Sequence, residues 1–160
     1  MTRVNLVHVQ DLADQHLFAE WRELKMVPAA LRRSLRTKTE QQVLKSVPSN
    51  YTMSTGHVLF FYDKMLFLHN RYLELDAELR NRNYNTVQHD AAEIFLADIP
   101  EAFKFKEWTP SAHEIETNAN RIVQRLNERP EWYRYYGDIT KPEYFEQLYR
   151  LQIDQHTTTC

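Results

Sequence analysis

Apolar side chains recur at three- and four-residue steps along most of this chain, which is the spacing of helices that bury one face. From Asp11 to Leu24 they fall on one narrow arc, and the opposite side of this predicted helix is polar. A second helix is predicted to start at Pro28, because proline fits the first helical turn. A shorter helix is predicted over residues 41–45.

The strongest periodicity follows Gly56. Apolar positions continue from there to Leu79 and predict one long helix that ends at about Arg80. The polar run over residues 81–90 then predicts a loop, and residues 91–108 fit a short helix followed by a turn.

A last helix is predicted to begin with Thr109 as its N-cap and Pro110 in its first position, and to end before Pro130. No segment has a convincing strand pattern. The predicted fold is therefore all-α: a compact single-domain helical protein with about three principal helices plus short helical turns and loops. We assign residues 1–137 to the domain and residues 138–160 to a polar C-terminal extension that is partly disordered towards its end.

Composition excludes several kinds of site. Two glycines are too few for the glycine-rich loops that cradle nucleotide phosphates. Cys160 is the only cysteine, so neither an intrachain disulfide nor a cysteine-based zinc site can form. His89 and Asp90 would need a second ligand pair to hold a metal ion, and we find none. No metal and no cofactor are expected.

The N-terminus lacks the apolar core of a signal peptide, and no run of roughly 18 uncharged apolar residues marks a membrane span. We therefore expect a soluble, intracellular protein without a membrane partner. The sequence leaves open whether it acts in the cytoplasm or the nucleus of a host.

The net charge of −2 argues mildly against a nucleic-acid partner, but the charges are unevenly distributed. Residues 1–50 carry eight lysines and arginines against five acids, whereas residues 74–116 carry ten acids and four basic residues. A basic and an acidic surface on one small protein would orient it against DNA. Ordinary scatter of charge is the alternative.

The first candidate for chemistry is the N-terminus. Threonine at position 2 is small, so removal of Met1 is expected to expose the α-amine of Thr2. An α-amino group has a pKa of roughly 8, against about 10.4 for lysine, and the neighbouring Arg3 would lower it further. Such an amine can attack C1′ of a nucleotide and form a Schiff base. An ordinary Met-Thr start is the alternative.

The second candidate is Glu23, which shares the first predicted helix with His16 and Arg22. Departure of a base from C1′ builds positive charge on the sugar, which a nearby carboxylate would stabilise, and the same group could accept the C2′ proton. Arg22 would keep Glu23 ionised and hold phosphate. A solvated helix face is the alternative reading of the same pattern.

Two further groups fit DNA binding. Arg121 and Arg125 lie one turn apart, off the apolar stripe of the last predicted helix, and a bound phosphate would relieve their mutual repulsion. Glu128 is an alternative partner for Arg125. The aromatic segment 132–136, with the sequence WYRYY, offers rings on which unstacked bases would stack, although part of it is expected to pack inward.

Four blocks of sequence together resemble the phage endonuclease V family of pyrimidine-dimer DNA glycosylases with abasic-site lyase activity. They are MTRVNL at residues 1–6, LADQHL-AE-REL at 12–24, GHV-FFYDK at 56–64 and RP-WYRYYG at 129–137. The resemblance implies a monomeric DNA repair enzyme that binds double-stranded DNA without metal or cofactor. It would excise ultraviolet-induced cyclobutane pyrimidine dimers through an imine of its N-terminal amine and then cleave the strand at the abasic site by β-elimination.

The resemblance also implies roles for single residues. Thr2 matches the family's nucleophile and Glu23 its catalytic carboxylate. Met26 stands where an arginine is expected, so we add the adjoining Lys25 to the DNA contacts, and whether it compensates stays open. The DNA-binding candidates are then Arg3, His16, Arg22, Lys25, Arg121, Arg125, Trp132, Tyr133 and Arg134.

Two other functions stay open. The same basic and aromatic residues would serve a DNA-binding module without catalysis, and an intact Met1 would favour that reading. An N-terminal-nucleophile hydrolase acting through the Thr2 hydroxyl usually needs a sheet-rich scaffold, and the sequence predicts no sheet.

Overall fold

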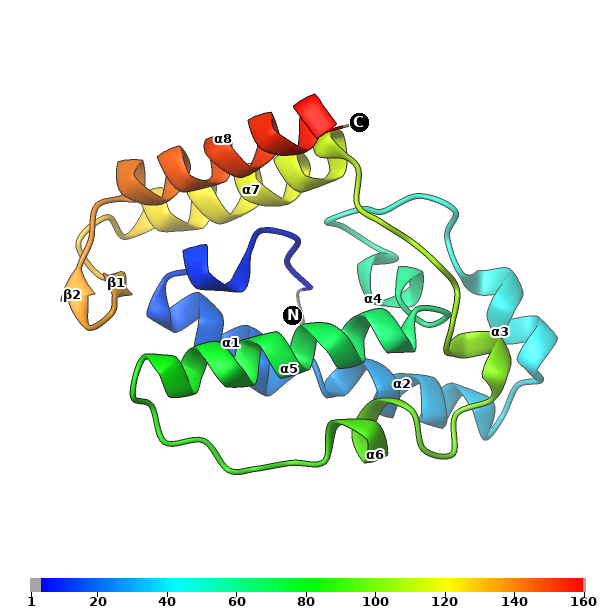
Figure 1. Cartoon of the computed structure of the whole chain (residues 1–160). Helices are drawn as coiled ribbons and strands as arrows, with labels where there is room; N and C mark the ends of the chain where they lie inside the picture. Colours follow the sequence, from blue (N-terminus) through cyan, green and yellow to red (C-terminus); the bar gives the residue numbers. More distant parts are fainter. Residues whose placement is uncertain (1–3, 160) are drawn as a thin grey trace. The chain divides into compact units, whose positions relative to one another are not determined.

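The computed structural model describes residues 4–159 and confirms the all-α prediction (Figure 1). The helices are α1 (Asp14–Glu23), α2 (Met26–Leu35), α3 (Glu40–Ser46), α4 (His57–Phe60), α5 (Met65–Asn81), α6 (Ala91–Phe95), α7 (Ala112–Glu128) and α8 (Pro142–Thr159). The remaining regular elements of this part of the chain are the 3₁₀ turns η1 (Val9–Asp11) and η2 (Glu101–Phe103) and the strands β1 (Arg134–Tyr135) and β2 (Asp138–Ile139). None of the described helices has the length and apolar character needed to cross a membrane.

The chain divides into two compact units. Unit 1 comprises Met1–Val4 and Glu20–Trp108, and unit 2 comprises Asn5–Ala19 and Thr109–Cys160. Helix α1 carries the chain from unit 2 into unit 1. The C-terminal extension that the sequence analysis set apart belongs to unit 2.

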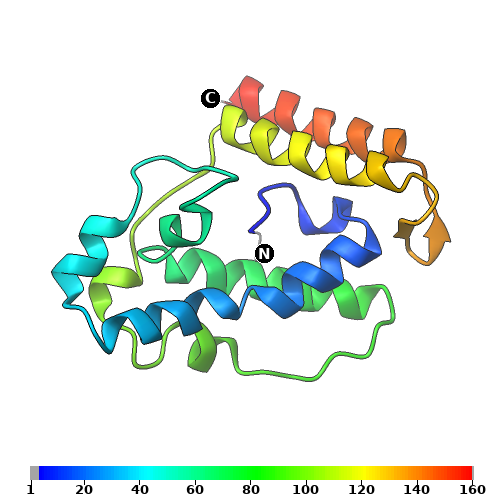
Figure 2. The ribbon, with the colours of Figure 1, turned by 180° about the vertical axis from the view of Figure 1, so that it is seen from behind.

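Unit 1 is organised around α5, against which α6 lies (Figure 2). A buried ion pair joins α5 to the end of α1, because the Arg71 guanidinium donates to both carboxylate oxygens of Glu20, at 2.6 and 3.0 Å. Such a bidentate pair holds Glu20 against α5 in a defined geometry more than it adds to stability. The apolar residues that α5 buries are Met65, Leu68, Tyr72, Leu75 and Leu79.

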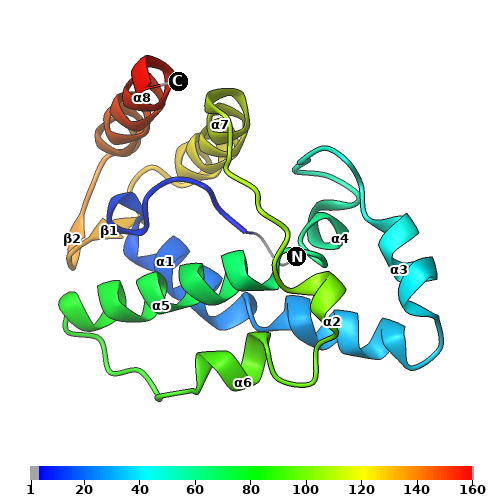
Figure 3. The same cartoon turned by 45° about the vertical axis from the view of Figure 1, so that its right-hand side comes forward.

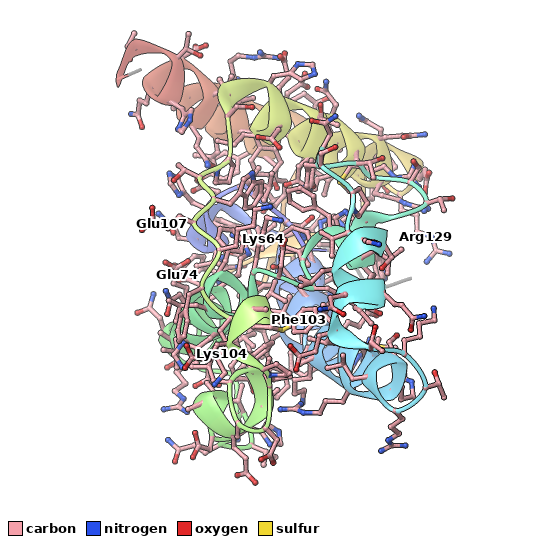
Figure 4. All side chains as sticks on the ribbon, turned by 90° about the vertical axis from the view of Figure 1, so that its right-hand side faces the viewer. Lys64, Glu74, Phe103, Lys104, Glu107 and Arg129 are labelled. Carbon is pink, nitrogen blue, oxygen red and sulfur yellow. The ribbon has the colours of Figure 1, made fainter. Side chains whose placement is uncertain are left out.

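The single long helix predicted after Gly56 is wrong: α4 ends at Phe60, and α5 begins at Met65. Lys64 lies among packed side chains at the break (Figure 4), and its ammonium donates to the Phe60 carbonyl at 2.8 Å and to Asp63 at 2.7 Å. A buried charge needs such partners. The three- and four-residue spacing of apolar side chains continues across the turn at residues 61–64, because α4 and α5 both bury their apolar residues in unit 1.

Unit 2 contains the antiparallel pair α7 and α8, which lie side by side (Figure 3). The N-cap of α7 is Ser111 and not the predicted Thr109. The Ser111 hydroxyl accepts from the backbone N–H of Glu114, whose carboxylate in turn accepts from the N–H of Ser111. This reciprocal capping box satisfies two backbone donors that a threonine two residues earlier would leave unpaired.

Helix α8 runs through Thr159, where a partly disordered tail was expected beyond Asp154. The sequence looked polar, yet Phe145, Tyr149 and Ile153 are buried at four-residue spacing and pack the helix within unit 2. One narrow apolar stripe is enough to order an otherwise polar helix when a neighbouring helix covers it.

The strands β1 and β2, of two residues each, form an antiparallel hairpin that the sequence analysis did not predict. Tyr136 and Gly137, the two residues between the strands, have positive φ angles of 52° and 86°. This backbone is that of the tight primed turns, whose twist matches antiparallel strands. Strands of two residues are too short to show an alternating pattern in sequence.

Candidate active site and nucleic-acid interface

The N-terminal end of the described chain is held in unit 1. Val4 is fully buried, and its backbone N–H donates to Nε2 of His57 at 2.8 Å. His57 Nδ1 lies 2.7 Å from the Thr52 carbonyl, so Nδ1 carries the proton and Nε2 is free to accept. The predicted nucleophile Thr2 and the predicted DNA contact Arg3 lie outside the described residues.

The next residues of the chain are held in unit 2 by two buried amides. Asn118 of α7 accepts from the N–H groups of Leu6 and Val7, at 2.7 and 3.3 Å. Gln152 of α8 accepts from the N–H of His8 at 2.8 Å and donates to the carbonyl of Leu6 at 3.2 Å. These side chains supply hydrogen bonds to a backbone segment that belongs to no helix or strand.

Glu23 is the last residue of α1, and its side chain is 31% exposed. The guanidinium of Arg22 pairs with it: Nη2 lies 3.9 Å from Oε1 of Glu23, and the Arg22 side chain is 63% exposed. The negative end of a helix dipole lies at the same place. A half-buried carboxylate there can stabilise positive charge that develops on a bound molecule.

Lys25 follows Glu23 in the turn between α1 and α2. Its ammonium lies 4.9 Å from the centroid of the Trp21 ring and 3.4 Å from Nε2 of His89. Met26 beside it is 55% exposed. The surface at this turn therefore presents a lysine held over an aromatic face, next to an exposed apolar side chain.

His16 lies in unit 2 against Tyr133, with the two ring centroids 4.7 Å apart. Its Nδ1 is buried and has no hydrogen-bond partner among the described residues. Burial, and to a smaller extent the cation of Arg125, lowers the pKa of His16 to about 4. The ring is therefore neutral at pH 7 and contacts any ligand as an uncharged donor or acceptor.

A pH titration followed by NMR of the His16 ring is expected to show a pKa well below 6.5. The Arg125→Ala variant should raise this pKa but leave it below 6.5, because burial is the larger cause. Since the unfolded chain binds more protons between about pH 6.5 and 4, His16 contributes stability above that window and loses it as the pH falls. Titration at the ordinary value would contradict this burial.

Arg121 and Arg125 lie off the buried stripe of α7, as predicted, with Arg121 half-buried and Arg125 exposed, and each has a partner. Arg121 donates to Gln124 at 3.0 Å, and Arg125 pairs with Glu128 at 3.2 Å. Exposed pairs of this kind contribute little to stability. Both guanidiniums can therefore exchange these contacts for phosphate at low cost.

The aromatic segment 132–136 alternates between a buried and an exposed side. Tyr133 is buried against His16, whereas Trp132 and Tyr136 are 49% and 46% exposed. Arg134, which lies between them in the sequence, is exposed, and the guanidinium carbon of Arg129 is 5.5 Å from the Trp132 ring centroid. The predicted inward packing of part of the segment is thus seen at Tyr133, whereas Trp132 and Tyr136 expose part of their rings.

Two residues of α1 that the sequence analysis did not single out hold this segment. Gln15 donates to the carbonyl of Trp132 at 2.7 Å and accepts from the N–H of Arg134 at 3.0 Å. Asp14 accepts from the N–H groups of Tyr136 and Gly137, at 3.2 and 2.8 Å. In the sequence, the one sign that Asp14 and Gln15 matter is that they lie within the LADQHL block at residues 12–17.

The predicted site residues fall into two groups. Unit 1 contains Arg22, Glu23 and Lys25, and unit 2 contains His16, Arg121, Arg125, Trp132, Tyr133 and Arg134. Over residues 4–159, no three His, Cys, Asp or Glu side chains cluster as metal ligands would. Asp90, weighed above as a ligand, instead caps α6 by accepting from the N–H groups of Ala92 and Glu93.

The chain matches a model of a known protein family. A family model described as pyrimidine dimer DNA glycosylase matches residues 1–91, more than half of the 160 residues. The matched region includes Thr2, Glu23 and the GHV-FFYDK block, and it ends before the group in α7 and the aromatic segment.

Proposed function

The chain belongs to the pyrimidine dimer DNA glycosylase family, and from that premise we propose a two-stage reaction. The protein excises an ultraviolet-induced cyclobutane pyrimidine dimer from double-stranded DNA and then cleaves the strand at the abasic site. Thr2 supplies the nucleophile and Glu23 the catalytic carboxylate. The observation that carries this proposal is the family match, which includes both residues.

In the first stage the lone pair of the Thr2 amine attacks C1′ of the damaged nucleotide. The glycosidic bond breaks, and its electron pair leaves with the pyrimidine nitrogen. The two amine protons pass, directly or through solvent, to that nitrogen and to O4′ as the sugar ring opens, which leaves an imine between the protein and C1′. The released pyrimidine stays attached to its neighbour through the cyclobutane ring.

In the second stage the imine is protonated and acidifies C2′. Glu23 accepts the C2′ proton, the C3′–O bond breaks, and the 3′ phosphate leaves with the electron pair. Water then hydrolyses the imine and regenerates the amine. The partial exposure of Glu23 and its place at the negative end of α1 support both roles, because the carboxylate is accessible and faces positive charge in each stage.

The remaining predicted residues bind the DNA in this proposal. Arg3, Arg22, Lys25, Arg121 and Arg125 neutralise phosphates, and the weak surface pairing of Arg125 favours the exchange. Trp132 and Arg134 offer a stacking face and a cation, while Tyr133 supports them from the buried side and keeps the neutral ring of His16 in place. A damaged, poorly stacked step lowers the cost of extruding a nucleotide.

We also propose that the protein acts as a monomer through residues 1–137. All the proposed catalytic and DNA-binding residues lie within that range.

Borohydride trapping tests the proposal. A duplex with one defined cyclobutane dimer, incubated with the protein and sodium borohydride, is expected to give a covalent adduct that mass spectrometry maps to the α-amine of Thr2. Without borohydride the strand should be cleaved with an unsaturated aldehyde at its 3′ end. Binding of the lesion with neither adduct nor cleavage would instead favour a DNA-binding module.

A further inference from the structure

The five residues Val4–His8 follow directly after the proposed nucleophile and its neighbour Arg3. We refer to Val4–His8 as the N-terminal arm. The arm precedes η1 and forms neither helix nor strand, yet all of it except His8 is buried. Buried backbone outside regular structure must find hydrogen-bond partners elsewhere. The backbone N–H groups of Val4, Leu6, Val7 and His8 donate to side chains.

From this pattern we infer that His57, Asn118 and Gln152 are positioning residues, which fix the arm so that the Thr2 amine is presented in one place. This inference rests on the proposed function of Thr2. None of the three touches the reacting atoms in the proposal; each acts through the backbone of the arm.

His57 is the positioning residue closest in sequence to the amine. Its Nε2 accepts from Val4 only in the tautomer that has its proton on Nδ1, and the Thr52 carbonyl, 2.7 Å from Nδ1, selects that tautomer. Tyr51 adds a weaker contact, since its hydroxyl lies 3.5 Å from the carbonyl of Val4. The backbone N–H of Val4 is therefore bonded two residues after the proposed nucleophile.

Gln152 gives the C-terminal extension a role. Its amide bonds the carbonyl of Leu6 and the N–H of His8, as a neighbouring strand would, and α8 carries it. Asn118 completes the set from α7, and its amide also donates to the side chain of Asn5 at 2.9 Å. Freeing any of these bonds gives the arm conformational freedom that an attacking amine has to lose again.

Two substitutions of one residue separate positioning from packing. In His57→Gln the amide oxygen reaches the place of Nε2 and can still accept from Val4, whereas in His57→Asn the shorter amide reaches only the place of Nδ1. With a duplex that contains a preformed abasic site and saturating protein, His57→Asn is expected to slow borohydride trapping by about 10- to 100-fold. His57→Gln should restore most of the rate, and duplex affinity should change by less than about threefold in both variants.

A second pair of variants tests the arm from α8. Gln152→Ala should speed hydrogen exchange at the His8 amide and slow trapping. Arg150→Ala removes only the 3.2 Å pair of the same helix with Glu116 and should change neither. If His57→Asn does not fold, the inference is tested by comparing the trapping rates and the His8 hydrogen exchange of Gln152→Ala and Arg150→Ala.

The inference is overturned if both His57 variants trap at the wild-type rate, if glutamine is no better than asparagine, or if Gln152→Ala matches Arg150→Ala. Failure of the proposed function looks different, because the wild-type protein itself would then give no adduct at Thr2. Slow hydrogen exchange at Val4 and His8 in that protein would show that the arm is fixed. Without an adduct at Thr2, however, both the nucleophile and its positioning would be overturned.

Discussion

Replacing Glu23 with glutamine is expected to slow strand cleavage by about 10²- to 10⁴-fold, the usual contribution of a positioned general base. Glutamine keeps the size and polarity of the side chain but carries no negative charge and accepts no proton. Glu23 pairs with the exposed Arg22 at 3.9 Å, and losing such a pair should leave the fold unaffected. Affinity for a dimer-containing duplex should stay within about threefold of wild type.

The measurement is single-turnover cleavage of two duplexes, one with a defined dimer and one with a preformed abasic site. The second duplex bypasses the glycosylase stage, so the two rates show which stage depends on the carboxylate. Glu74→Gln is the matched control, because Glu74 is an exposed carboxylate on α5, outside the proposed site (Figure 4). Wild-type rates for Glu23→Gln on both duplexes would remove Glu23 from the mechanism.

Moving the N-terminal amine by one residue should be comparably damaging. One glycine inserted before Thr2 displaces the amine by up to about 3.6 Å along the chain once Met1 is removed. Nucleophilic attack needs the reacting atoms within about 3.5 Å in a defined orientation, so we expect cleavage and borohydride trapping to fall by at least about 10²-fold. Mass spectrometry of the purified variant establishes which residue carries the free amine.

Thr2→Ala is the control for this insertion. Alanine is also small enough for removal of Met1, so the variant keeps the amine and loses only the hydroxyl. It should trap and cleave at close to the wild-type rate. Loss of activity in Thr2→Ala together with full activity of the glycine insertion would point to the hydroxyl, as in an N-terminal-nucleophile hydrolase.

For the two predicted groups of site residues, the structure adds different information about where the side chains lie. The sequence analysis selected Arg121 and Arg125 because they lie off an apolar stripe, and on α7 Arg125 is exposed while Arg121 is half-buried. It selected Glu23 as part of a polar helix face, and the structure adds that this carboxylate ends the helix. The position of a helix terminus depends on where packing stops the helix, which periodicity alone leaves uncertain by a few residues.

Residues that act by holding the backbone were missed for a common reason. Asn118 falls within the apolar stripe of α7, and Gln152 lies beside the buried Ile153 on α8. A polar residue on a buried helix face is expected to have a hydrogen-bond partner, but the sequence does not show which residue that partner is. Their partner is the N-terminal arm, more than a hundred residues away along the chain.

The sequence by itself determined the helical class, the buried faces of α1, α5 and α7, and the resemblance that leads to Thr2 and Glu23. These features follow from spacing and chemistry over a few neighbouring residues, which are local properties. Only the tertiary structure decided the break at residues 61–64, the cap at Ser111 and the bonding of the N-terminal arm. Each of these depends on where buried charges and buried backbone groups find their partners, and that is settled only when distant segments pack together.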